Sequence, residues 1–203
     1  GAAIVQKLLP VQFPRFVMSL AVILILLAIT GSRRRIFLRL GEVNATAKPI
    51  PYVLTDPPRW GRLGIYIAAA LTGGVLVFVL VSGGFPSGGV VLKTLPLVPI
   101  ILLLAANNAF GEEMIYRASL LSTLEVPLGA SQALLTSSVL FGIGHYYGVP
   151  YGPLGVIMST FAGWLLGKAM LETRGMFWSW LIHFCMDVSI FFLMAVGSVT
   201  PGG

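Results

Sequence analysis

Six apolar runs, separated by short polar or glycine- and proline-rich connections, divide this sequence of 203 residues. A helix that spans a bilayer needs about 20 mostly apolar residues, and each run is near or above that length. The runs cover residues 16–32, 63–82, 90–121, 130–146, 154–171 and 176–196. The pattern predicts an all-α fold, a polytopic transmembrane bundle of about six spanning helices. The first run lacks the small-residue cleavage signature of a signal peptide, so we expect it to remain as a spanning helix.

The composition agrees with a protein that lies in a membrane. Hydrophobic residues make up 57% of the chain, charged residues make up 10%, and the mean hydropathy is +0.92. A soluble domain carries about 25% charged residues, so this chain could not keep a folded surface hydrated. The net charge is +6, but the sequence lacks the pattern of basic and aromatic residues that binds nucleic-acid bases. We therefore expect no nucleic-acid partner, and we assign the charge to a surface near anionic lipid.

Basic residues are unevenly distributed between the two sides of the predicted bundle. One side, which holds the connection 33–62 and the turns near 125 and 174, carries Arg33, Arg34, Arg35, Arg39, Lys48, Arg59, Arg62, Lys168 and Arg174. The other side carries Lys7, Arg15 and Lys93. Because cytoplasmic loops are enriched in lysine and arginine, we expect the first side in the cytoplasm and both termini outside.

A small group of ionisable residues lies inside the apolar runs. The group comprises Glu112, Glu113, Arg117, His145, His183 and Asp187. On insertion scales a charged side chain at the centre of a membrane helix costs about 2.5–3.5 kcal/mol, so such residues are rare and usually functional. We expect them to face the interior of the bundle or a hydrated cavity and to form a functional site.

The two adjacent glutamates of the third run have different surroundings. Glu113 and Arg117 are four residues apart, so they can form an ion pair on one helix face, and the simplest role of that pair is structural. Glu112 points about 100° away and has no such partner on its own helix. A carboxylate of this kind is a candidate general base. The alternative is a hydrogen-bonded carboxyl with a structural role.

Each histidine has a candidate partner one helical turn away. Phe141 and His145 share a face of the fourth run, and His183 and Asp187 share a face of the sixth. A carboxylate beside an imidazole can fix its tautomer and stabilise its charged form. A lone histidine in an apolar helix is more often a satisfied core residue, and Phe141 is more simply a packing residue or a wall that orients His145. Two histidines together with carboxylates on other helices favour a shared site.

Three motifs follow one another in the second half of the chain. Residues 112–117 read Glu-Glu-Met-Ile-Tyr-Arg, residues 141–145 run from a phenylalanine to a histidine, and residues 183–187 run from a histidine to an aspartate. Together they resemble the EExxxR, FxxxH and His-xxx-Asn/Asp motifs of the CAAX-protease and bacteriocin-processing family (CPBP or ABI) of intramembrane endopeptidases. The resemblance covers about residues 95–196.

The resemblance implies a helical core with a cavity open to the cytoplasm and a role for each motif residue. Glu112 would activate a water for attack on a peptide carbonyl with the help of His145, while His183 and Asp187 would stabilise the oxyanion. The second glutamate and the arginine of EExxxR would form a structural pair beside them. Known relatives trim the last three residues of prenylated CAAX proteins or take part in bacteriocin maturation and self-immunity.

Position 187 departs from the pattern, because the best-known CAAX-cleaving members have Asn there. An ionised Asp cannot donate to an oxyanion, so Asp187 would have to be protonated or would serve His183 instead. The Asp also makes Glu112, His145, His183 and Asp187 a plausible ligand set for zinc or another divalent ion. The chain has no HExxH pair, and the family is described as glutamate-type and metal-independent, so we expect no metal and no other cofactor.

The leading interpretation is a membrane-embedded endopeptidase with a peptide or protein substrate, for which a prenylated tail is one candidate. Residues 1–89 would form an N-terminal unit of two spanning helices with a basic cytoplasmic connection, and residues 90–203 a CPBP-like catalytic core of four. A catalytically silent scaffold, or a subunit of a larger membrane complex, would instead use the buried polar cluster for helix packing. A transporter would use it as a proton relay, but we see no internal repeat and few helices.

Overall fold

The computed structural model describes residues 2–50, 52, 55–56 and 58–199, and the regular structure of these residues is helical apart from one isolated bridge between Thr46 and Arg59. The predicted all-α fold is confirmed. The elements are α1 (Ala2–Thr30), α2 (Trp60–Gly83), α3 (Gly88–Thr94), the 3-10 turn η1 (Leu95–Leu97), α4 (Val98–Glu112), the π-helical segment η2 (Glu113–Ala118), α5 (Ser119–Leu128), α6 (Ala130–Gly144), α7 (Gly152–Thr173) and α8 (Phe177–Val199).

Five helical stretches among the described residues are long and apolar enough to cross a membrane. They are Leu8–Thr30, Trp60–Gly83, Gly88–Leu128, Gly152–Thr173 and Phe177–Val199. The fourth predicted run forms the shorter helix α6, which has 15 residues and ends at Gly144. At 1.5 Å per residue α6 is about 22 Å long, less than the hydrocarbon thickness of about 30 Å. His145 therefore caps a helix that ends inside the bundle.

The first span begins earlier than the hydropathy pattern predicts. Residues 16–32 were expected to span, with Arg15 in the outer connection, whereas the helix α1 is continuous through Arg15 and its apolar stretch starts at Leu8. The prediction for Arg15 was wrong because a single charged residue ends an apolar run in a hydropathy scan but does not end a helix. This correction matters for the site, because Arg15 now lies within the span.

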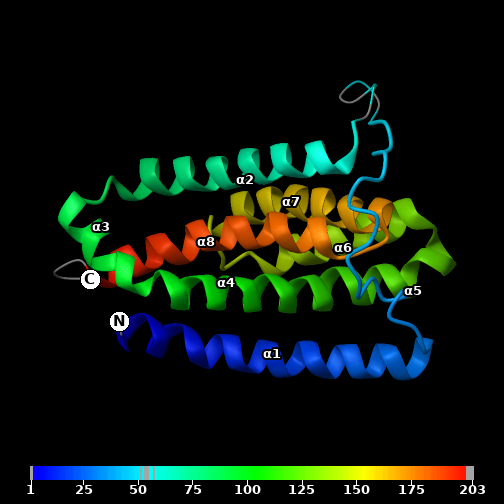
Figure 1. Cartoon of the computed structure of the whole chain (residues 1–203), viewed down its shortest axis with the longest axis horizontal. Helices are drawn as coiled ribbons and strands as arrows, with labels where there is room; N and C mark the ends of the chain where they lie inside the picture. Colours follow the sequence, from blue (N-terminus) through cyan, green and yellow to red (C-terminus); the bar gives the residue numbers. More distant parts are fainter. Residues whose placement is uncertain (1, 51, 53–54, 57, 200–203) are drawn as a thin grey trace.

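Figure 1 shows α1, α2, α4 and α8 running side by side, with both termini at one end of the bundle and the connection between α1 and α2 at the other end. The helix α1 packs on α4 and on η2, α2 packs on α8, and α6 packs on α7. The first two helices are thus in contact with the helices that carry the three motifs.

Close helix contacts position the motif residues of α6. A Cβ atom at Gly142 would lie 2.6 Å from the carbonyl oxygen of Val156 and would also meet the hydroxyl of Thr160, both on α7. Only glycine allows this approach, because a side chain there would push the two backbones apart. Gly142 lies between Phe141 and His145, so the contact with α7 fixes the depth and rotation of the FxxxH motif.

The polar connection between α1 and α2 is attached to the ends of α7 and α8. Trp60 Nε1 donates to Glu172 Oε2 (2.9 Å), and Trp178 Nε1 donates to the carbonyl oxygen of Val43 (2.8 Å). Buried indole N–H groups need such acceptors. These bonds hold the N-terminal segment against the rest of the bundle.

Candidate active site

The structure brings the motif residues together from three helical stretches, which are the continuous α4–η2 segment, α6 and α8. Glu112 is the last residue of α4, and the adjoining π-helical segment η2 carries the other two charged residues of the first motif. Phe141 and His145 lie at the end of α6, and the α8 helix carries His183 and Asp187. A π-helical turn inside a longer helix is rare and is frequent at functional sites. The six ionisable residues that the sequence singled out share one buried cluster.

Glu113 is the centre of the buried polar contacts. Its Oε1 atom lies 3.0 Å from Arg117 Nη1 and 2.7 Å from His183 Nδ1, and its Oε2 atom accepts a hydrogen bond from the hydroxyl of Ser179. The ion pair with Arg117 is the one that the spacing predicted, and both side chains are completely buried. A buried pair of this kind needs further contacts to offset desolvation. Glu113 has the hydrogen bonds from Ser179 and His183, whereas no described residue hydrogen-bonds to the guanidinium nitrogens of Arg117.

His183 is oriented by Glu113 rather than by Asp187. The sequence suggested Asp187 as its partner, one turn away, but Asp187 Oδ2 lies 3.7 Å from His183 Nε2, beyond hydrogen-bond distance. Glu113 is paired with Arg117 and acts as an acceptor, so His183 Nδ1 carries the proton of this bond. The remaining nitrogen, Nε2, faces Glu112, whose Oε2 atom lies 3.6 Å away.

Phe141 supports both sides of the site. Its carbonyl oxygen accepts a 2.8 Å hydrogen bond from His145 Nδ1, because a carbonyl cannot donate, and its ring lies 4.1 Å from that imidazole between centroids. The guanidinium carbon of Arg117 lies 3.6 Å from the centre of the same ring, a cation–π contact in a dry environment. Phe141, which was expected to pack beside His145, therefore also packs over the guanidinium group of Arg117.

The second carboxylate oxygen of Glu112 is the point at which both imidazoles converge. Glu112 Oε2 lies 3.6 Å from His145 Nε2 and 3.6 Å from His183 Nε2. His145 Nδ1 donates to a carbonyl oxygen, so the Nε2 atom of a neutral His145 ring is an acceptor. Glu112 Oε2 is buried, and no described residue hydrogen-bonds to it. This oxygen and the two Nε2 atoms converge on one point, where they can exchange protons with a water molecule or a reacting group.

Residues that the sequence analysis missed hold the other side of Glu112. Arg15 Nη1 on α1 donates to Glu112 Oε1 and to Asn108 Oδ1, at 2.7 Å in each case. Gln12 Nε2 donates to the same Asn108 oxygen at 2.8 Å. Gln12 and Arg15 are three residues apart on an apolar helix, and Asn107 and Asn108 interrupt another apolar run. Those polar residues at helical spacing were the signal that could have found them.

The amide of Asn108 links Arg15 to Asp187. Since Asn108 Oδ1 accepts from Arg15 and Gln12, its Nδ2 must be the atom that lies 3.0 Å from Asp187 Oδ2, and it donates there. Asp187 Oδ2 is therefore an acceptor. An Asn at this position could accept the same bond through its oxygen and still donate through its nitrogen.

A cavity of about 400 Å³ opens next to these residues. Its polar wall includes Arg15, Asn108, Glu112, His145 and Asp187, and apolar side chains from α1 and α8, among them Leu8, Val11, Phe191 and Met194, make up another part of its lining. These residues belong to the half of the bundle that carries both termini (Figure 1). An apolar pocket with a few convergent polar groups is the usual form of a substrate site.

Metal ligation was the alternative use of the four residues Glu112, His145, His183 and Asp187. Within the described part of the chain, no group of three or more histidine, cysteine, aspartate or glutamate side chains is arranged to hold a metal ion.

Comparison with known proteins gives one family match. Residues 93–189 match the sequence model of the Rce1-like family, described as type II CAAX prenyl endopeptidase. No curated protein and no solved structure matches the chain. The matched segment contains all three motifs, whereas α1 and α2, and with them Gln12 and Arg15, lie outside it. The chain is thus a polytopic membrane protein whose residues 93–189 match the Rce1-like, type II CAAX prenyl endopeptidase family, in agreement with the resemblance to the CPBP family.

Proposed function

We propose that this chain is an active membrane-embedded endopeptidase in which Glu112 activates a water for attack on a peptide carbonyl. The family is one of membrane proteases, and the glutamate mechanism is the step that we add. The observation that carries it is the position of Glu112 Oε2, buried, without a hydrogen bond from any described residue, and 3.6 Å from the Nε2 atoms of two histidines. A general base must lie within reach of the proton that it takes.

In the proposed reaction Glu112 Oε2 accepts one proton of the water while the water oxygen bonds to the carbonyl carbon. His145 Nε2 accepts the hydrogen bond of the second proton and holds the water in place. When the tetrahedral intermediate collapses, the C–N bond breaks and the proton held by Glu112 passes to the leaving amine. His183, fixed by Glu113 through Nδ1, lines the other side of the reacting centre.

The oxyanion needs a donor, and Arg15 is the candidate that the contacts favour. Asp187 Oδ2 already accepts from Asn108, so it is not a donor through that atom. Arg15 lines the cavity and uses only Nη1 in its hydrogen bonds to described residues. Its side chain is 41% exposed, so Nη2 is available to a substrate. Donors placed where negative charge develops supply a large part of the rate enhancement in acyl transfer.

The substrate that we propose is a peptide or protein segment that enters the cavity beside apolar side chains. A prenylated C-terminal tail is the first candidate because of the family match, and an unprenylated leader peptide is the second. The apolar lining from α1 and α8 could accept either a lipid chain or an apolar side chain.

The test is hydrolysis of paired prenylated and unprenylated fluorogenic peptides by purified protein in lipid nanodiscs. We expect Glu112→Gln to lower kcat by about 10²–10⁴-fold, the usual contribution of a general base. The matched control is Glu42→Gln, which makes the same change at an exposed glutamate. If wild type cleaves and Glu112→Gln cleaves equally well, the mechanism is wrong. If no peptide is cleaved although the protein is folded, the catalytically silent scaffold gains support.

A separate measurement is needed to determine on which side of the membrane the cavity opens, because two expectations conflict in this fold. The distribution of arginines favours the connection 33–62 in the cytoplasm, while the resemblance implies a cytoplasmic cavity. The cavity lies in the half of the bundle opposite that connection. In a Cys185→Ala background, an impermeant thiol reagent added to intact cells should label either Ser32→Cys or Ser87→Cys. Labelling at 32 alone places the cavity on the cytoplasmic side, and labelling at 87 alone places it on the outer side.

A further inference from the structure

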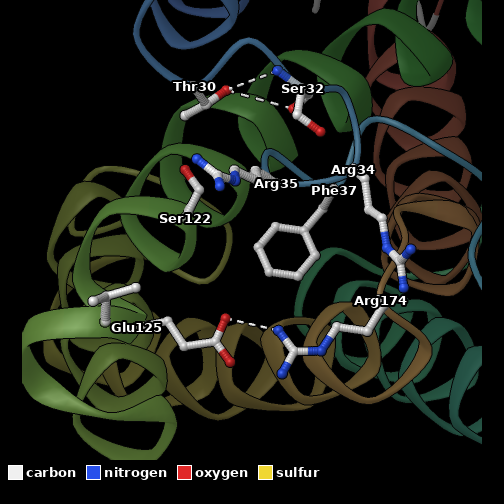
Figure 2. Close-up of a pocket in the computed structure, with 9 residues that line it drawn as sticks. Thr30, Ser32, Arg34, Arg35, Phe37, Ser122, Glu125 and Arg174 are labelled. Carbon is white, nitrogen blue, oxygen red and sulfur yellow. Dashed lines mark hydrogen bonds and ion pairs between the residues drawn. The ribbon is translucent and has the colours of Figure 1, made fainter.

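A second cavity, of about 740 Å³, lies at the other end of the bundle. It is formed where α1, α5 and α7 end and where the connection after α1 folds back over them (Figures 1 and 2). Its lining consists of Thr30, Ser32, Arg34, Arg35, Phe37, Ser122, Glu125, Val126 and Arg174. None of these residues takes part in the proposed peptidase site, so the cavity needs its own explanation.

The charge of this cavity is positive. Figure 2 shows the side chains of Arg34, Arg35 and Arg174 arranged around the ring of Phe37. Glu125 is the single acidic residue of the lining, and its Oε2 atom lies 2.8 Å from Arg174 Nη1. Arg34 and Arg35 are exposed, and neither forms an ion pair with any described residue. Two guanidinium groups thus remain uncompensated beside a neutralised pair.

The walls of the cavity are held in place by contacts of the connection. Phe37 is 2% exposed and adopts a positive φ of 57°, which packing must support in a residue that is not glycine. Arg39 Nε donates to the carbonyl oxygen of Arg174 at 2.7 Å, so it ties the connection to the end of α7. The arginines therefore stand on a fixed surface rather than on a loose loop.

The lining combines groups that bind phosphate. Guanidinium groups bind phosphate oxygens through paired hydrogen bonds, and the hydroxyl of Ser32 adds a polar group. The hydroxyls of Thr30 and Ser122 donate to carbonyl oxygens of their own helices. Apolar residues stand next to it: Ile29 is 75% exposed and Val126 is 91% exposed. Helix ends of a spanning bundle are expected near the headgroup region, where exposed apolar side chains can contact the first part of an acyl chain.

We propose that this cavity binds the phosphate headgroup of an anionic phospholipid, with its acyl chains along the exposed apolar side chains of α1 and α5. The proposal is independent of the peptidase activity. An inorganic or soluble organic phosphate would share the headgroup chemistry but not the contact with Ile29 and Val126. A diffuse attraction between a basic loop and the membrane surface would not distinguish arginines inside the cavity from those beside it.

The binding test uses full-length protein in a neutral detergent and three probes: short-chain phosphatidylglycerol, short-chain phosphatidylcholine and inorganic phosphate. We expect the wild type to bind phosphatidylglycerol more tightly than either of the other probes. Arg34→Gln and Arg35→Gln should each raise the Kd for phosphatidylglycerol about five-fold, and the double variant about 25-fold, because each arginine near a lipid phosphate contributes a factor of about five. Arg33→Gln is the matched control for either single variant, because it removes one charge from an exposed arginine outside the cavity.

A further variant tests whether weaker lipid binding in the arginine variants results from a loss of folding. Glu125→Gln removes the one carboxylate of the lining and frees Arg174, so it should lower the Kd for phosphatidylglycerol. The proposal is overturned if Arg33→Gln weakens binding as much as each cavity arginine, if phosphatidylcholine binds as tightly as phosphatidylglycerol, or if inorganic phosphate binds as tightly as the lipid.

Discussion

Arg15 donates a 2.7 Å hydrogen bond to Oε1 of Glu112, and this bond joins a helix outside the matched family segment to the first residue of the EExxxR motif. The same nitrogen holds Asn108, so one guanidinium positions both the proposed base and the amide that contacts Asp187. The other carboxylate oxygen of Glu112 is left to face the two histidines. The proposed site is therefore complete only when α1 is packed on α4.

Loss of Arg15 should affect the chemical step more than substrate binding. We expect Arg15→Gln to lower kcat by about 10²–10³-fold, the usual effect of removing one donor to an oxyanion, with a much smaller change in KM. Arg15→Lys should recover part of the loss because it keeps the charge but not the forked geometry. Steady-state kinetics in nanodiscs separates the two parameters. An unchanged kcat in Arg15→Gln would remove Arg15 from the mechanism and leave it a structural partner of Glu112.

Asp187→Asn should be tolerated. Asn at 187 can still accept the hydrogen bond from Asn108 Nδ2, and its amide adds a donor beside the cavity. We expect its kcat to equal or exceed that of the wild type. Asp187→Leu should instead leave the Asn108 donor without a partner, at a cost of about 1–3 kcal/mol in the free energy of unfolding. If Asp187→Asn is as inactive as Glu112→Gln, the negative charge itself is required, and the divalent-ion alternative returns.

The buried ion pair should contribute strongly to stability. Arg117→Met leaves Glu113 without its cation where neither side chain is exposed, so we expect a loss of about 3–5 kcal/mol in the free energy of unfolding. Arg117→Met/Glu113→Gln should lose less than Arg117→Met alone, because Gln can still accept from His183 Nδ1. Unfolding by denaturing detergent in mixed micelles measures both.

The exposed pair provides the control for this prediction. Arg174→Met removes the ion pair to Glu125, which at 2.8 Å is shorter than the 3.0 Å pair of Arg117 with Glu113. The Arg174 side chain is 53% exposed, so the expected loss in the free energy of unfolding is below about 1 kcal/mol. Equal losses in Arg117→Met and Arg174→Met would show that burial does not set the strength of the Glu113 pair.

Gly142→Ala should separate α6 from α7. Its methyl group would lie 2.6 Å from the carbonyl oxygen of Val156, and a backbone atom cannot move aside without shifting the helix. We expect a loss of about 1–3 kcal/mol in stability and a fall in kcat, because Phe141 and His145 move with α6. Gly73→Ala in α2, where no atom lies within 4 Å of the new methyl group, is the matched control and should be neutral or slightly stabilising. A neutral Gly142→Ala would contradict the close packing of the two helices.

The sequence predicted the helices and the contacts within one helix well, because both depend on residues that are close together in the chain. Hydropathy identified all the apolar segments, although the short α6 falls below the length of a span. The four-residue spacing of Glu113 and Arg117 predicted an ion pair that the structure contains, because two residues one turn apart on a helix face the same side whatever surrounds them. The motif order was sufficient to identify the family.

The same local reasoning did not find the hydrogen-bond partner of His183. Asp187 on the same helix lies within ion-pair distance at 3.7 Å, but the 2.7 Å hydrogen bond goes to Glu113 on another helix. The same reasoning also placed Arg15 outside the bundle, although that residue contacts Glu112. Spacing along one helix says nothing about the rotation and depth at which a second helix packs.

The sequence by itself determined that this protein is a helical membrane bundle. It also determined that the three motifs place ionisable side chains inside apolar helices, where a charge is unfavourable. Those properties follow from composition and from the 3.6-residue period of a single helix. Only the tertiary structure decided which of these side chains meet, that α1 supplies Arg15 to Glu112, and that a second basic cavity forms at the far end. These relationships depend on contacts between distant segments, such as Glu113 and His183, 70 residues apart, and Arg15 and Glu112, 97 residues apart. Such contacts are set by how side chains interlock between helices.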